Sequence, residues 1–211
     1  MTAVQGGLFI TFEGGDGAGK TTQLDLARQY LESLGRPVFR TREPGGTPMG
    51  VQVREILLKS SGPIDPRAEA LLFAADRAQH INTLVQPNLN RGLDVLQDRY
   101  FDSSVAYQGA GRALDGDQVR DISIWAANGL LPDLTILLDI DPKVAAGRVT
   151  HRGQADRIEA EADEFRVRLR EEFLAISRAE PERVKVVDAN LSVAEVAADI
   201  RNLLNRLVMR Q

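Results

Sequence analysis

Residues 14–21, near the start of the chain, constrain its fold more than any other feature. They read G-G-D-G-A-G-K-T, which fits the pattern G-x-x-x-x-G-K-T, and they lie between an apolar run and a stretch with helical periodicity. Glycines allow the backbone to curl so that its N–H groups converge on phosphate oxygens, and a following helix adds partial positive charge. This strand–loop–helix setting favours a phosphate-binding loop over a glycine-rich turn that carries a surface lysine.

The side chains of this loop predict a nucleoside triphosphate bound together with Mg²⁺. Lys20 supplies a mobile positive charge for the β- and γ-phosphates, and the Thr21 hydroxyl is placed to ligate Mg²⁺. The loop alone does not name the reaction. A switch GTPase is disfavoured because it needs an N-K-x-D motif, and no lysine of this chain follows an asparagine. The predicted nucleotide-binding residues are Gly14, Gly15, Asp16, Gly17, Ala18, Gly19, Lys20, Thr21 and Thr22.

The composition narrows the remaining classes. Hydrophobic residues make up 43% of the 211 positions, which supports a packed core, and the length suggests one domain spanning residues 1–211. The absence of cysteine excludes a thiolate metal site and a cysteine nucleophile. The net charge of −4 disfavours a globally basic protein, so no nucleic-acid partner is expected.

The chain shows neither a targeting signal nor a membrane-spanning pattern. No basic segment precedes an apolar stretch at the N-terminus, so a signal peptide is not expected. No uninterrupted apolar run approaches the roughly 20 residues that cross a bilayer, so no membrane association is expected. The expected location is therefore the cytoplasm.

Apolar runs alternate with helical segments from end to end. Strands that are apolar almost throughout and alternate with helices indicate a parallel sheet covered on both faces. The expected fold is α/β, with a five-stranded parallel sheet, helices on both faces and a small lid segment. Ligands of such folds bind at the carboxyl ends of the strands. The expected strands are Leu8–Phe12, Pro37–Thr41, Leu93–Gln97, Leu134–Ile140 and Val184–Val187.

Two helices have clear boundary signals. Asp65 and the proline after it predict the start of a long helix that runs to about Leu84, where Pro87 and Gly92 are expected to close it. Ser192 is expected to cap the last helix, whose apolar residues recur on one face.

Charged side chains follow two of the expected strands. Arg42 and Glu43 precede Pro-Gly-Gly, a stiff turn that would place them beside the phosphate loop, although an ordinary loop with a solvated ion pair explains the pattern equally well. Asp98 can hold Mg²⁺ through water, and Arg99 can clamp a phosphate with its bidentate fork. A structural salt bridge at a strand end accounts for this second pair at least as well.

Phe73 and Arg77 lie four residues apart in the expected long helix and therefore share a face. An aromatic ring beside a guanidinium could stack on a base and hydrogen-bond its edge. The alternative for Phe73 is a place in the core, because Leu71, Leu72 and Ala74 surround it.

Residues 148–160 form the expected lid. This polar segment between two helices contains Arg152 and Arg157. Phosphoryl transfer depends on positioning and charge neutralisation, which a mobile segment carrying arginines can deliver. The alternative is a solvated connector between helices.

Taken together, these segments resemble the bacterial thymidylate kinases, a family of P-loop nucleoside monophosphate kinases. The resemblance covers nearly the whole chain, and its first motif is shared with all P-loop proteins, whereas the next three in combination are far more specific. It implies transfer of the γ-phosphoryl group of ATP to dTMP, giving dTDP, with Mg²⁺, and a homodimer. The motifs, in chain order, are F-E-G-G-D-G-A-G-K-T-T, T-R-E-P-G-G-T, L-L-F-A-A-D-R, D-R-Y-F-D-S-S-V-A-Y-Q-G and R-G-Q-A-D-R-I-E.

The same resemblance implies roles for the acceptor side of the site. Phe73 would stack on thymine and Arg77 would bond its edge. Arg99 would hold the dTMP phosphate, with Arg42 and Glu43 nearby. The other residues that the resemblance brings to the acceptor are Asp16 near the deoxyribose 3′-hydroxyl, Tyr107 where a 2′-hydroxyl would be excluded, and Ser104 and Gln108 around thymine.

The resemblance also implies how charge is supplied. Asp98 would help to place Mg²⁺. The variable positions of the phosphate loop hold no basic residue, which resembles the bacterial type of the family, so Arg152 and Arg157 would supply transition-state charge together with Lys20 and Arg99. No general base is required, because the acceptor is a phosphate oxygen that is already anionic at neutral pH.

Two further functions compete with this hypothesis. A kinase of another nucleotide or of a deoxynucleoside would turn over dCMP, UMP or thymidine in preference to dTMP. A regulatory P-loop protein would bind ATP without acceptor-dependent turnover, and the lid arginines argue against it because a pure binder does not need them.

Overall fold

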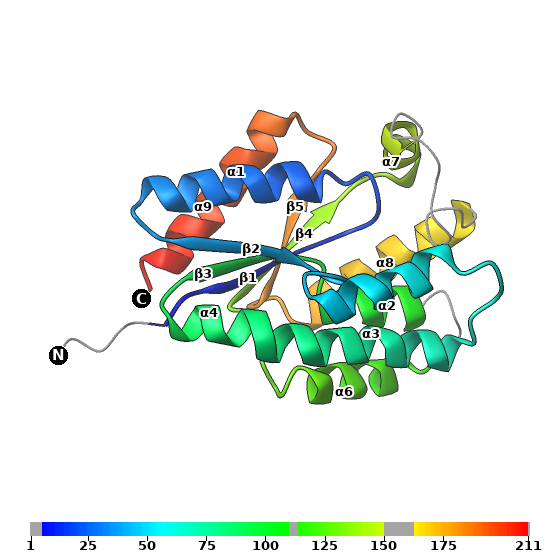
Figure 1. The fold of residues 1–211 in the computed structure, drawn as a ribbon. Helices are drawn as coiled ribbons and strands as arrows, with labels where there is room; N and C mark the ends of the chain where they lie inside the picture. Colours follow the sequence, from blue (N-terminus) through cyan, green and yellow to red (C-terminus); the bar gives the residue numbers. More distant parts are fainter. Residues whose placement is uncertain (1–5, 110–113, 150–162, 211) are drawn as a thin grey trace.

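The computed structural model describes residues 6–109, 114–149 and 163–210, and a parallel sheet forms its centre (Figure 1). All strand pairs are parallel, in the order β2-β3-β1-β4-β5. The predicted α/β fold with a five-stranded parallel sheet is confirmed. The strands are β1 Phe9–Glu13, β2 Val38–Arg42, β3 Asp94–Asp98, β4 Leu134–Asp139 and β5 Val184–Asp188.

Every strand ends on a charged residue. Four of the five strands extend one residue beyond the apolar run that predicted them, whereas β4 stops one residue short of Ile140. In these four strands the backbone pairing continues past the apolar run to a charged residue at the carboxyl edge of the sheet. Charged groups therefore line the carboxyl edge of the sheet, where α/β folds bind their ligands. These residues are Glu13, Arg42, Asp98, Asp139 and Asp188.

Helices cover both faces of the sheet, as predicted (Figure 1). Helices α1 and α9 pack against each other on one face, and the helical segments that follow β2 and β3 cover the other. Among the described residues, no helix is both long and apolar enough to cross a membrane. The helical elements are α1 Lys20–Ser33, α2 Pro48–Lys59, α3 Pro66–His80, η1 Ile81–Val85, α4 Gln86–Asn90, α5 Phe101–Ser104, η2 Val105–Gly109, α6 Gly116–Ala126, α7 Pro142–Val149, α8 Asp163–Ala179 and α9 Val193–Val208.

Neighbouring residues of one strand point to the two faces. In β1, Phe9 packs with Ile81 and Val85, whereas Ile10 belongs to the cluster that contains Leu24 of α1 and Ile200 of α9. This alternation follows from the two-residue period of a strand. It explains why the buried strands β1 and β4 carry apolar residues at consecutive positions.

The long helix that begins at Asp65 does not end near Leu84, and the prediction that Pro87 closes it was wrong. The chain passes from α3 through the π-helical turn η1 into α4 without leaving helical geometry. Pro87 lies in the first turn of α4, directly after η1, where the backbone changes from the π-helical to the α-helical hydrogen-bond pattern. Gly92, with a φ of 80°, follows the true end of the helix.

The caps at the two predicted helix starts are confirmed. The Asp65 side chain accepts hydrogen bonds from the backbone N–H groups of Arg67 and Ala68. Ser192 and Glu195 form a reciprocal capping box at the start of α9. Both helices therefore begin where the local sequence supplies partners for their free N–H groups.

Candidate active site

The phosphate loop joins β1 to α1 at the centre of the sheet. Gly14 and Gly17 have φ values of 130° and 81°. A Cβ at Gly14 would lie 2.5 Å from the Leu138 carbonyl oxygen, and one at Gly17 would lie 2.6 Å from the Ala145 carbonyl oxygen. Both positions therefore require glycine on two counts, backbone conformation and close approach to neighbouring backbone.

The loop ends in the N-terminus of α1. Gly19 precedes the helix with a φ of 90° and caps it with no side chain, so the first N–H groups of α1 face the loop. Lys20 is buried, and its Nζ donates to the carbonyl oxygens of Gly14 and Gly15, each at 2.9 Å. Burial and the nearby Arg99 lower the pKa of Lys20. The geometry provides converging N–H dipoles and one ammonium group, the elements of an anion site.

Thr21 and Asp98 lie together beside this loop. The Thr21 hydroxyl donates to Asp98 Oδ2 at 3.4 Å, and Asp98 Oδ1 is buried with no hydrogen-bond partner among the described residues. Hydroxyl and carboxylate oxygens suit Mg²⁺, so the two predicted metal residues fit the ion. The described residues contain no cluster of three or more carboxylate or imidazole ligands. This donor set suits an ion that keeps waters and takes phosphate oxygens for its other ligands.

The Arg99 side chain links the phosphate loop to Tyr107 of η2. Its backbone is in the left-handed region, with a φ of 66°. One guanidinium nitrogen, Nη1, donates to the Gly14 carbonyl at 3.2 Å, and the other, Nη2, donates to Asp16 at 2.5 Å and to the Tyr107 hydroxyl at 3.1 Å. Burial opposes ionisation of Asp16, but the charges of Arg99 and Lys20 lower the pKa of that carboxyl to about 2. Three residues predicted to share a site thus form one hydrogen-bonded group.

A pocket opens beside this group, and eight of the predicted acceptor residues line it. Arg42 is exposed and is not one of its lining residues, although Arg42 lies close to Gly45 in the following turn. The eight come from four separate segments of the chain. They are Asp16, Glu43, Phe73, Arg77, Arg99, Ser104, Tyr107 and Gln108.

Phe73 and Arg77 project from one face of α3 into this pocket. Phe73 is half-buried and belongs to none of the hydrophobic core clusters, so the core alternative for this residue is not what the structure shows. Arg77 is fully buried, and its guanidinium donates to Glu43, Ser104 and Ser123, each at 3.0 Å. The Arg42-Glu43 alternative of a solvated ion pair fails for Glu43, which is buried and pairs with Arg77.

Sequence reasoning did not predict the buried hydrogen-bonded side chains around Glu43, the partner of Arg77. The second carboxylate oxygen of Glu43 lies 3.0 Å from His80 Nδ1, and His80 Nε2 lies 2.6 Å from the Thr41 hydroxyl. Asp76 is fully buried and accepts from the Gly45 backbone N–H. Burial and Glu43 raise the pKa of Asp76 to about 7. The only local signal was the D-R-A-Q-H spacing, which places these side chains on one helix face but does not identify their partners.

Glu13 is another buried charged residue beside the phosphate loop that the sequence did not single out. It ends β1, is fully buried, and accepts hydrogen bonds from the backbone N–H of Tyr100 and from the Ser103 hydroxyl. Burial raises the pKa of Glu13 to about 8, and the charge of Asp102 adds to the rise. A carboxyl directly before the phosphate loop was the available signal.

The raised pKa of Glu13 predicts a pH-dependent cost to folding. Between the unfolded pKa of 4.5 and the folded pKa of about 8, the unfolded chain has released a proton that the folded chain retains. The free energy of unfolding should therefore fall with rising pH in this window, relative to Glu13→Gln, which cannot titrate. Urea unfolding of both proteins from pH 5 to 9 measures the difference. A gap that stays constant over this range would contradict the prediction.

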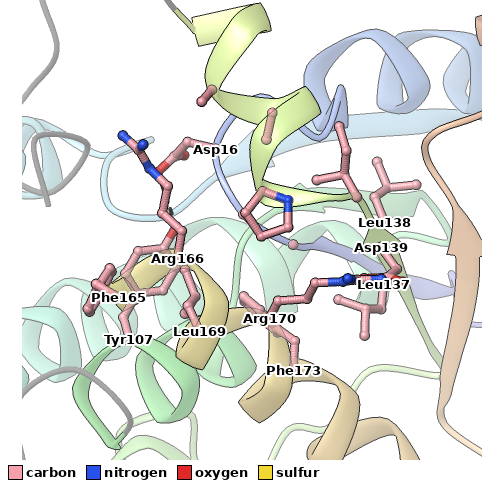
Figure 2. A pocket seen from close by; sticks show the side chains of 16 residues that line it. Asp16, Tyr107, Leu137, Leu138, Asp139, Phe165, Arg166, Leu169, Arg170 and Phe173 are labelled. Carbon is pink, nitrogen blue, oxygen red and sulfur yellow. Dashed lines mark hydrogen bonds and ion pairs between the residues drawn. The ribbon is translucent and has the colours of Figure 1, made fainter. Parts of the chain in front are cut away.

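A second pocket lies on the other side of the phosphate loop, between the end of β4 and helices α7 and α8 (Figure 2). Its walls are mainly apolar, with Phe165, Leu169 and Phe173 from α8. Arg170 and Asp139 form a bidentate ion pair at its edge, at 2.6 and 2.8 Å. Sequence reasoning did not predict this pocket. Asp16, Tyr107 and Phe165 line both pockets and therefore form the wall between them.

The lid prediction falls largely outside the described residues. Arg152 and Arg157 lie in the segment 150–162, which the structure does not describe. Arg148 belongs to α7, and its guanidinium donates to the Ala189 carbonyl at 3.2 Å.

Comparisons with known proteins all point to one family. Residues 12–200 match the family model described as thymidylate kinase. The thymidylate kinase of Leifsonia xyli subsp. xyli is 61% identical over 196 residues, which cover 92% of this chain and 93% of the relative. The thymidylate kinase of Clavibacter michiganensis subsp. michiganensis is 56% identical over 203 residues, 96% of each chain.

A solved structure extends the likeness to the fold. The crystal structure of thymidylate kinase from Ehrlichia chaffeensis matches with a TM-score of 0.76 at 33% identity, covering 94% of this chain and 99% of that one. Family, sequence and fold agree over nearly the whole length. The chain therefore belongs to the thymidylate kinase family.

Proposed function

We propose that the chain transfers the γ-phosphoryl group of ATP to dTMP in the presence of Mg²⁺, giving dTDP. Membership of the thymidylate kinase family makes it an enzyme that phosphorylates dTMP in dTTP biosynthesis. The observation that supports the finer proposal is the pocket beside the phosphate loop, where Phe73, Arg77 and Arg99 converge.

In this proposal, different residues of the acceptor pocket bind the base and the phosphate of dTMP. Phe73, half-buried on the pocket wall, stacks on the thymine ring. Arg77 hydrogen-bonds the base edge from a guanidinium that Glu43 and Ser104 hold in place. Gln108, whose Oε1 is buried without a partner among the described side chains, faces the same end of the pocket.

The sugar and the phosphate lie closer to the phosphate loop. Arg99 binds the acceptor phosphate with its fork, exchanging part of its contact with Asp16 for phosphate oxygens. Asp16 lies near the 3′-hydroxyl, and Tyr107, which donates to Asp16 at 3.1 Å, excludes a 2′-hydroxyl. We also propose that Arg42 contributes from the pocket rim.

On the donor side, Lys20 exchanges its two carbonyl partners for phosphate oxygens of ATP. Thr21 and Asp98 hold Mg²⁺, which neutralises charge on the bound phosphates. Arg152 and Arg157 add positive charge from the lid. No residue needs to remove a proton, because the attacking phosphate oxygen is anionic.

The test is release of ADP from ATP and Mg²⁺ with dTMP, dUMP, dCMP, UMP and thymidine offered separately. The fastest turnover is expected with dTMP. Preference for another acceptor would overturn the roles given to Phe73, Arg77 and Tyr107 while retaining a P-loop kinase. ATP binding without turnover of any acceptor would support a regulatory protein instead.

Phe73→Ala is expected to weaken dTMP binding by about 1–3 kcal/mol, the scale of base–aromatic stacking. The reason is that the ring lines the pocket and belongs to no core cluster. Calorimetric titration with dTMP measures the loss, and urea unfolding of the same variant serves as the control. A large loss of folding stability with unchanged affinity would show that Phe73 is a core residue after all.

We further propose that the chain forms a homodimer through neighbouring helices that carry exposed apolar side chains. Helix α2 packs on α3, and α3 packs on α6. Trp125, at the end of α6, is 80% exposed. Large exposed apolar side chains on adjoining helices are typical of protein interfaces. The others on these helices are Met49, Val51, Ile56 and Leu71.

Trp125→Glu is expected to shift the protein toward monomer, because it places a charge where an apolar contact is proposed. Light scattering coupled to size-exclusion chromatography measures the mass. Met209→Glu is the matched control, since Met209 is 87% exposed at the end of α9 on the other face of the sheet. A wild-type monomer, or equal behaviour of both variants, would contradict the proposed interface.

The cytoplasmic location, the single domain and the absence of a nucleic-acid partner stay predictions.

A further inference from the structure

Glu13 lies next to the phosphate loop and does not line the acceptor pocket. It is the last residue of β1, directly before Gly14 of the phosphate loop. One carboxyl oxygen, Oε1, accepts from the Tyr100 backbone N–H at 2.7 Å and from the Ser103 backbone N–H at 3.4 Å. The other, Oε2, pairs with the Ser103 hydroxyl at 2.5 Å. The residue is 0% exposed.

These contacts fix the backbone on both sides of Arg99. The Arg99 N–H donates to the Phe12 carbonyl at 3.0 Å, and the next N–H, of Tyr100, donates to Glu13. Arg99 itself has a left-handed φ of 66°, which is unfavourable for an L-residue and persists only when its surroundings hold it. The end of β1 therefore holds this backbone conformation.

The side chain of Arg99 is tied to the same carboxyl. Nη1 of Arg99 donates to the Ser103 hydroxyl oxygen at 3.0 Å, so one hydroxyl links the guanidinium to Glu13. Both protonation states of Glu13 preserve this link. When Glu13 is ionised the hydroxyl donates to Oε2, and when Glu13 is protonated its O–H donates to the hydroxyl oxygen, which has two acceptor sites.

A purely structural role explains this residue poorly. Burying a carboxyl costs folding free energy that an apolar side chain of similar volume would not cost. Here the burial is strong enough to raise the pKa of Glu13 to about 8. This folding cost has a functional reason if the carboxyl holds the Arg99 guanidinium in the orientation that binds the acceptor phosphate.

We propose that Glu13 is a positioning residue that aims the Arg99 guanidinium at the acceptor phosphate, through the Tyr100 N–H and the Ser103 hydroxyl. This inference rests on the proposed function, in which Arg99 binds the phosphate of dTMP. It assigns Glu13 and Ser103 to specificity for a phosphorylated acceptor over its nucleoside.

The test compares binding of dTMP with binding of thymidine by calorimetry, together with steady-state kinetics for dTMP. Glu13→Met keeps the length of the side chain but removes both acceptors, and Ser103→Ala removes only the hydroxyl. Glu13→Gln is the conservative variant, since its amide can accept from Tyr100 and donate to Ser103. Asp94→Asn is the control, because Asp94 is equally buried and accepts a backbone N–H from Leu8 at the opposite end of the sheet.

Glu13→Met and Ser103→Ala are each expected to lose about tenfold in dTMP affinity, within the range of couplings between residues in contact, while thymidine affinity is unchanged. The double variant should lose little more than either single one. Glu13→Gln should stay close to wild type. The control should lower stability without changing the ratio of the two affinities.

Two outcomes overturn the inference in distinguishable ways. If the wild type turns over dTMP and prefers it to thymidine, but Ser103→Ala and Glu13→Met keep that preference, Glu13 is structural only. If the wild type binds thymidine as tightly as dTMP, Arg99 does not bind the acceptor phosphate, and both the inference and its basis in the proposed function fail. Should Glu13→Met not fold, Ser103→Ala decides alone.

Discussion

Lys20→Met is expected to lower kcat by about 10²–10³-fold, the cost of removing one preorganised group that stabilises developing charge. The ammonium group is buried and is held by the carbonyl oxygens of Gly14 and Gly15, so it is already at the mouth of the loop before phosphate arrives. A buried charge acts in a medium of low polarity and is worth more there than in water. Methionine keeps the length of the side chain and removes only the charge.

Steady-state ADP release with saturating dTMP measures this effect. Lys59→Met is the matched control, because Lys59 is an exposed lysine of α2 that pairs with Glu55. Wild-type kcat is expected for the control. Circular dichroism of Lys20→Met should match the wild type, since the substitution relieves a buried charge. Retention of at least a tenth of wild-type kcat by Lys20→Met would show that the loop binds phosphate without taking part in transfer.

Arg152→Ala and Arg157→Ala are expected to lower kcat by up to about 10³–10⁵-fold, the range for arginines that stabilise phosphoryl transfer. The phosphate loop has no basic residue at its variable positions, so this charge must come from elsewhere. Arg99 is committed to the acceptor side by its contacts with Asp16 and Tyr107. We expect the lid arginines Arg152 and Arg157 to supply it, as the family resemblance implies.

The signature of this role is a change in kcat with little change in dTMP affinity, because the charge matters only when the phosphoryl group moves. Arg168→Ala, an exposed arginine of α8, is the control and should behave as wild type. A loss confined to one of the two lid variants would identify the residue that acts. Full kcat in both would remove the lid from the mechanism.

Local sequence determined the architecture and the phosphate loop. Five apolar runs separated by helices allow few folds other than a covered parallel sheet, because each strand must be buried on both faces. The glycines of the loop carry their own conformational requirement, which the structure bears out at Gly14 and Gly17. Asp65 and Ser192 likewise specify helix starts through partners only two or three residues away. The wrong helix end, at Pro87, came from a signal that depends on where in a helix a proline lies.

The acceptor site was predictable only in part. Eight of the nine acceptor residues named from the sequence line one pocket. The spacing of Phe73 and Arg77 and the order of the strand ends pointed to part of this set, whereas Asp16, Ser104, Tyr107 and Gln108 came only from the family resemblance. The motifs did not distinguish a solvated Glu43 from one buried against Arg77 and His80. Periodicity predicts which side chains share a face of a helix, whereas the hydrogen-bond partners of Arg77 lie 27 to 46 residues away in the sequence.

The tertiary structure alone decided what holds the site in shape. Parallel pairing of β1 with β3 brings Phe12 opposite Asp98, which places Glu13 against Tyr100 and Ser103 across 87 and 90 residues of chain. No local pattern encodes such a contact, because it follows from strand order and not from neighbours in sequence. The sequence by itself determined the fold class, the phosphate loop and the family. Only the packed sheet brings the buried Glu13 carboxyl against Tyr100 and Ser103, next to Arg99. The apolar surroundings of this carboxyl exist only after the strands have assembled.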